Sequence, residues 1–113
     1  MPSYVLLLKY TDEGMQNIKY LPQHISALRQ AVEAAGGHLP HVCLTMGQYD
    51  LVALIEAPTD QSCASIVLAL CSVGNVRSTT LRAFKEEELP ELAASLPSLE
   101  DDFSRILNQS WST

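Results

Sequence analysis

A tight turn that opens directly into an apolar strand is encoded by MGQYDLVA at residues 46–53. A two-residue hairpin turn commonly needs a positive φ, which glycine adopts without strain, so we expect Gly47-Gln48 to form this turn. The strands that it joins are predicted at residues 38–46 and 49–57, and the second is apolar on both faces. The chain therefore contains a β-hairpin whose outgoing strand lies inside a sheet.

Helical and strand patterns alternate outward from this hairpin. Residues 3–10 form another strand with apolar side chains on both faces, so it is also predicted to be central. The remaining elements are a helix that restarts at Pro22 and ends at Gly36-Gly37, a second helix from Pro58 to Gly74, and a more polar edge strand at 76–84. The order βαββαβ predicts an α+β, ferredoxin-like sandwich with a four-stranded antiparallel sheet.

Only one face of this sheet can be covered by the two helices. The central strands carry Leu and Val side chains on both faces, so an apolar face would remain open in a single chain. We therefore expect a homodimer or a higher even-numbered oligomer, of the dimeric α+β barrel type.

The sequence changes character after Phe84. We place the domain at residues 1–92 and an acidic, helical C-terminal extension at 93–113, with Phe103 and Trp111 as large apolar groups on the extension. Such groups on an acidic segment indicate that the extension docks on a surface.

Composition and charge restrict the functional class. Apolar residues make up 47% of the chain, charged residues 18%, and the net charge is −6. Residues 1–84 hold six acidic and five basic side chains, whereas residues 85–113 hold seven acidic and two basic ones. Neither part offers a basic face to nucleic acid or an anionic membrane. Three cysteines without a Cys-x-x-Cys spacing fit a reducing compartment, and the cytoplasm is the expected location.

The candidate ligand-binding residues gather at the turn, the first long helix and the last strand. They are Met46, Tyr49, Asp50, His24 and Arg82. Asp50 either contacts a ligand or accepts backbone N–H groups of its own turn. Arg82 either binds an anion or pairs with a neighbouring carboxylate. His24 is either a general base acting with Asp50 or an exposed helix residue.

A metal site is not predicted. His38 and His41 have opposite parity on their strand, so only His41 and Cys43 can share a side, and two ligands do not make a zinc site.

Two motifs carry a resemblance to a known family. LTMGQYDLVA at residues 44–53 and GNVRSTTLRAF at residues 74–84 resemble the GYD-domain family over roughly residues 2–92. The resemblance implies a dimeric ferredoxin-like fold without an established biochemical role. The family often has arginine where this chain has His24. More distantly, the same motifs also resemble the ligand-binding domain of leucine-responsive transcription regulators. In this chain we expect no helix-turn-helix before that domain.

These observations predict a homo-oligomeric, cytosolic module that binds a small organic ligand or an interaction partner without a cofactor. The alternative is a cofactor-free enzyme of the dimeric α+β barrel type, an isomerase or monooxygenase that uses Asp50, Tyr49 or His24 for proton transfer.

Overall fold

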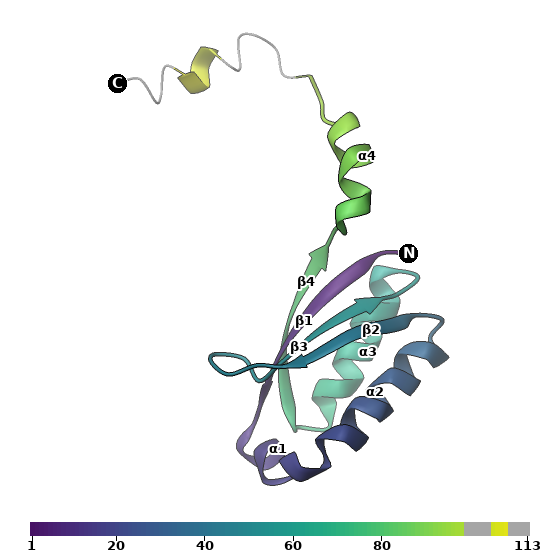
Figure 1. Cartoon of the computed structure of the whole chain (residues 1–113), viewed down its shortest axis with the longest axis vertical. Coiled ribbons are helices and arrows are strands. Elements are labelled where there is room, and N and C mark those ends of the chain that lie inside the picture. The colour runs from purple at the N-terminus through teal and green to yellow at the C-terminus, as the bar shows by residue number, and fades with distance from the viewer. Residues whose placement is uncertain (99–104, 109–113) are drawn as a thin grey trace.

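The computed structural model describes residues 1–98 and 105–108, and its elements follow the predicted order (Figure 1). The strands are β1 (Ser3–Tyr10), β2 (His38–Leu44), β3 (Leu51–Glu56) and β4 (Val76–Ala83). The helices are α1 (Asp12–Gln16), η1 (Ile18–Tyr20), α2 (Leu21–Ala34), α3 (Asp60–Ser72), η2 (Glu86–Glu88) and α4 (Leu89–Ala94).

The sheet has the order β2-β3-β1-β4, and all its pairings are antiparallel. β1 and β3 are central and β4 is an edge strand, as predicted. With α2 and α3 as the two long crossover helices, this order is that of a ferredoxin-like sandwich, which confirms the predicted fold class.

The core lies between the sheet and the two long helices. β3 alternates between buried Leu51, Ala53 and Ile55 and half-buried side chains on the opposite face. Leu6 and Leu8 of β1 are fully buried on the same side as the β3 residues, where they meet Val32 of α2. A strand exposes alternate side chains to opposite faces, so the core uses only one face of this sheet.

The predicted two-residue hairpin turn is wrong. The last pair of the hairpin is Leu44–Leu51, so six residues, 45–50, connect β2 to β3. The Thr45 N–H donates to the Asp50 carbonyl at 2.8 Å, and the Thr45 hydroxyl donates to the Tyr49 carbonyl at 2.7 Å. Gly47 still has a positive φ of 146° within this longer loop. As a result, β2 ends two residues earlier than the sequence predicted, and β3 begins two residues later.

The chain after β4 leaves the body of the fold (Figure 1). Two residues after the end of β4, the Lys85 ammonium forms an ion pair with the Glu56 carboxylate of β3 at 3.1 Å. α4 follows at the position of the predicted helical pattern, and its Leu89 and Leu92 are exposed. Phe103 and Trp111 lie outside the described residues. None of the described helices combines the length and apolar character that a membrane span requires.

Candidate functional site

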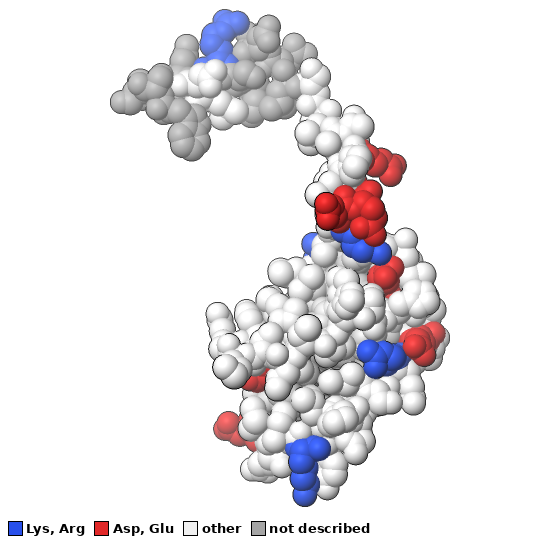
Figure 2. Space-filling view, in the orientation of Figure 1, with Lys and Arg blue, Asp and Glu red and all other residues white. Residues whose placement is uncertain are grey.

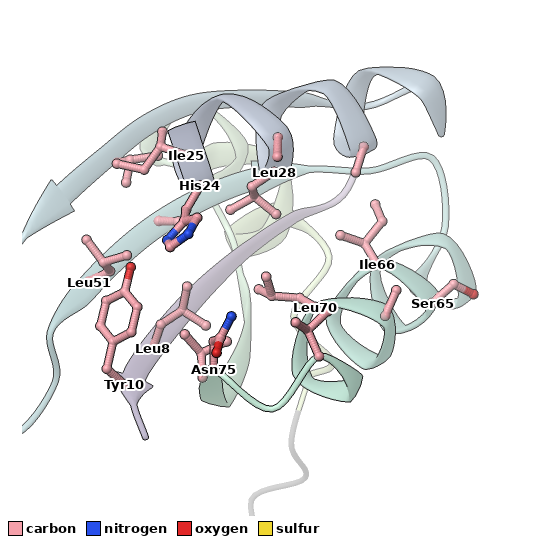
Figure 3. Close-up of a pocket in the computed structure, with 17 residues that line it drawn as sticks. Leu8, Tyr10, His24, Ile25, Leu28, Leu51, Ser65, Ile66, Leu70 and Asn75 are labelled. Atoms are coloured by element: carbon pink, nitrogen blue, oxygen red, sulfur yellow. The ribbon is translucent and has the colours of Figure 1, made fainter. Parts of the chain in front are cut away.

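An apolar pocket of about 500 Å³ opens between α2, α3 and the covered face of the sheet (Figure 3). Leu8, Leu51, Ala53 and Val76 form its floor. Its walls come from the two helices and the segment after α3: His24, Ile25, Ala27, Leu28, Ala31, Ser65, Ile66, Ala69, Leu70, Val73 and Asn75.

Small side chains on the facing sides of the helices leave this space open. Ala27 and Ala31 of α2, and Ser65 and Ala69 of α3, are among the residues that line the pocket. Alanine and serine do not reach far enough to interdigitate across two helices, so the gap is not filled by the chain itself. A cavity of this size and character is typical of sites that take small molecules.

The polar groups of the pocket are few. The His24 ring and the Tyr10 hydroxyl lie at the end near Leu51, and the Asn75 amide faces the same space (Figure 3). Burial and then the charge of Asp50 raise the pKa of Tyr10 above its ordinary value. Its hydroxyl is protonated at neutral pH and can donate a hydrogen bond. An apolar body with one polar group at this end would match the lining.

Among the residues selected from sequence, His24 lines the pocket and Asp50 does not. The Asp50 carboxylate accepts the backbone N–H of Tyr10 at 2.8 Å, and its own N–H donates to the Leu8 carbonyl at 2.8 Å. It therefore serves a backbone group, as one of the two interpretations expected, but the group belongs to β1 instead of its own turn. These bonds fix the start of β3 against the end of β1.

Tyr49 and Met46 belong to the loop at 45–50 and do not line the pocket. Met46 is 99% exposed, and Tyr49 is half-buried. The structure thus brings only one of the three proposed proton-transfer residues to the pocket wall.

Arg82 lies on the covered side of β4, opposite Tyr4 of β1. Its guanidinium donates to the carbonyl oxygens of Ser3, at 3.2 Å, and Ala83, and it stacks over the rings of Tyr4 and Phe84. Carbonyl groups and aromatic faces therefore take the place of the carboxylate that we expected as its structural partner.

The opposite sheet face forms a second surface of interest, which we call the open face. Its central rows are apolar: Val5 and Leu7 of β1, Val52 and Leu54 of β3, Cys43 of β2 and Leu81 of β4. No helix of the described chain covers these side chains, and Leu81 is 48% exposed. His41 and Cys43 both belong to this face, and no described cluster of three or more His, Cys, Asp or Glu residues could hold a metal ion.

Sequence reasoning missed most of the pocket. Tyr10 shares its parity with Leu6 and Leu8, which was a sufficient signal for its inward orientation. Asn75 had no comparable signal, since its position depends on how the turn after α3 meets α1.

Comparison with known proteins identifies the family. The GYD domain matches residues 4–93. The chain belongs to the GYD domain family.

Relatives of this GYD domain include a protein of Thermus thermophilus named glutamine synthetase and cystathionine beta-lyase binding protein. The two are 30% identical over 90 residues, which are 79% of this chain and 95% of the relative. A crystal structure of a protein from the same organism aligns with a TM-score of 0.49 at 24% identity, over 75% of this chain and 95% of that chain.

Proposed function

We propose that this GYD domain is a cytoplasmic, homodimeric binding module that holds a small apolar ligand between α2 and α3. The observation that carries the proposal is the apolar pocket of about 500 Å³ with only a few polar groups in its lining, among them His24, Tyr10 and Asn75. A pocket of this kind binds by apolar burial and uses its few polar groups for orientation.

Self-association through the open face completes the module. Val5, Leu7, Val52 and Leu54 form a contiguous apolar surface on the two central strands, and a second copy can bury the same surface in return. The pocket of each copy lies on the covered side of the sheet, opposite the open face, so dimerisation leaves the pocket accessible to a ligand.

The name of the Thermus relative supports a further part of the proposal, that the module also binds a protein. The relative is named for two enzymes that it binds, and the alignment spans 95% of its length. We extend protein binding to this chain as a class of activity.

Filling the pocket tests ligand binding. Ala69→Trp places a large side chain in the pocket, whereas Ala34→Trp places the same side chain on an exposed site of α2 that does not line it. The probe is 8-anilinonaphthalene-1-sulfonate, an apolar anion whose fluorescence reports burial. We expect saturable binding to weaken at least tenfold in Ala69→Trp and to stay unchanged in Ala34→Trp. Equal binding by both variants, with unchanged melting curves, would contradict the proposal.

A sedimentation experiment tests self-association separately. We expect the wild-type chain to sediment as a dimer or larger even-numbered oligomer at micromolar concentration, and Leu7→Glu to shift it to a folded monomer. A charged group in an apolar interface would remain desolvated and unpaired, which opposes association. A wild-type monomer at this concentration would remove self-association from the proposal and leave the pocket test intact.

A further inference from the structure

Two basic side chains lie directly opposite each other at one end of the open face. Lys9 of β1 pairs in register with Arg77 of β4, and both are exposed. Like charges directly opposite on neighbouring strands are unfavourable. Within residues 1–98 and 105–108, neither side chain has a carboxylate partner in an ion pair, and the Lys9 ammonium only reaches the Gln48 carbonyl at 3.3 Å. We call Lys9 and Arg77 the basic pair.

An acidic run lies at the other end of the same strands. Glu86, Glu87 and Glu88 form η2, which is separated from the end of β4 by two residues, and Figure 2 shows acidic side chains gathered where the C-terminal segment leaves the body. Of these, Glu88 accepts the Lys85 N–H at 3.1 Å, and Glu87 lies 3.8 Å from the Lys85 ammonium.

The start of this segment is held on the open-face side of the sheet. Ser3 is in register with both Glu56 and Ala83, so these three residues share the open face. The Lys85 ammonium contacts the Glu56 carboxylate at 3.1 Å, and Ser3 is completely buried at this end. The acidic run is therefore positioned beside the surface that a second copy would cover.

Of the two-fold arrangements that place one open face on another, those with the axis along the strands and across the strands are the two extremes, and charge distinguishes them. A two-fold axis parallel to the strands keeps the strand ends together and places β4 over the partner's β2, so both acidic runs lie at one end, both basic pairs lie at the other, and opposite charges do not meet. An axis in the interface and perpendicular to the strands stacks β4 on the partner's β4 with the ends exchanged. The acidic run of one copy then lies beside Arg77 of the other, with Lys9 on the neighbouring strand.

We infer that the acidic run of each subunit docks on the basic pair of a second copy, so that two charge clusters set the orientation of the dimer. The inference rests on the proposed self-association through the open face and adds its direction. Apolar rows between the clusters supply the contact area, while the clusters exclude the arrangement with parallel ends. The cost of placing Lys9 opposite Arg77 within one chain is then offset by the carboxylates of the partner.

Charge exchange between variants provides the test. One variant is Lys9→Glu/Arg77→Glu, and the other is Glu86→Lys/Glu87→Lys, which leaves the Glu88 contact in place. The control is Lys19→Glu/Arg29→Glu, which makes the same change of charge on η1 and α2, away from the open face. Dissociation constants are measured by sedimentation for each variant alone and for the two reversed variants mixed, with native mass spectrometry to count heterodimers.

We expect each reversed variant alone to dissociate at least tenfold more readily than wild type, and their mixture to form heterodimers with nearly wild-type affinity. The control should associate like wild type. If the wild type and the Leu7→Glu variant behave as proposed but the mixture shows no preference for heterodimers, the inference fails and the dimer remains. A wild-type monomer overturns both.

Discussion

At the scale of single residues, two glycines are required for different reasons. Gly14 of α1 is buried against the turn after α3, where a Cβ would overlap the Asn75 carbonyl oxygen. The Thr11 side chain, which caps α1, donates to the Gly74 carbonyl at 2.7 Å, and the Thr11 N–H donates to the Asn75 carbonyl at 2.9 Å. Gly47 has open space around it, and only its positive φ favours glycine.

We predict that Gly14→Ala destabilises the fold more than Gly47→Ala. The first change forces α1 away from Asn75 and should cost about 2 to 3 kcal/mol, the upper part of the overpacking range. The second adds only backbone strain, about 1 kcal/mol. Chemical denaturation of the two variants measures both values, with Gln16→Ala on the exposed part of α1 as control. The reverse order would show that α1 can move freely.

Tyr4 should give stability a dependence on alkaline pH. Burial, and then the hydrogen bond that its hydroxyl donates to Asp60, raise the pKa of Tyr4 from 10.0 to about 12. The folded pKa exceeds the unfolded one, so this stabilisation is complete below about pH 10 and is lost as the pH rises through about 12.

The measurement compares the free energy of unfolding of wild type and Tyr4→Phe between pH 9 and 12. We expect a smaller decline in the variant, which has no ionisable group at this position. Tyr10, whose pKa is also raised, is present in both proteins and cancels in the difference. Parallel declines would indicate that the Tyr4 pKa is not raised in the folded state.

At the scale of elements, Asp50 joins the β2–β3 hairpin to β1. Its carboxylate, amide and carbonyl groups bond Tyr10, Leu8 and Thr45 respectively, each at 2.8 Å. Three backbone groups, two from β1 and one from the hairpin loop, therefore converge on one residue where the loop ends and β3 begins. This concentration of bonds accounts for an aspartate at the start of an apolar strand.

We expect Asp50→Asn to cost at most about 1 kcal/mol, because the amide keeps an oxygen that can accept the Tyr10 N–H. Asp50→Ala removes the acceptor and should cost about 1 to 3 kcal/mol. Thermal unfolding measures the stabilities, with Glu33→Gln on exposed α2 as control. The pocket probe should bind Asp50→Asn as it binds wild type. A tenfold loss, about 1.4 kcal/mol, would instead make Asp50 part of the ligand site.

At the scale of the whole molecule, the sheet has more apolar surface than its two long helices can cover. Two helices bury one sheet face, and the pocket between them is where that cover is incomplete. The other face keeps its apolar rows, with a basic pair at one end and an acidic run at the other. Both unfilled surfaces arise from the same limit, that a small domain has too few elements to enclose its own sheet.

The thiols provide a prediction at this scale. Cys43 is exposed on the open face of the single chain, whereas Cys63 is buried in the core. A second copy on that face would shield Cys43, so iodoacetamide should label it at least tenfold more slowly in wild type than in Leu7→Glu. Cys63 should resist labelling in both folded proteins. Rates are followed by mass spectrometry, and rapid labelling of Cys43 in wild type would place the interface elsewhere.

The sequence by itself determined the order of elements, the central positions of β1 and β3, and the alternation that divides the sheet into two apolar faces. These features follow from local periodicity and from Gly and Pro at element ends, which act within a few residues of themselves. The GYD motifs fixed the family for the same reason, because they lie in continuous segments.

Only the tertiary structure decided the length of the hairpin loop, the partner of Asp50 and the members of the pocket. Each depends on residues far apart in the chain. The Asp50 carboxylate accepts a hydrogen bond from the Tyr10 N–H of the neighbouring strand β1. Asn75 reaches the pocket wall because the turn after α3 packs on α1. The basic pair likewise arises only from the register of β1 and β4. Periodicity predicts the face of the sheet on which a side chain lies. Strand register and helix packing determine its neighbours on that face, and both depend on the complete tertiary structure.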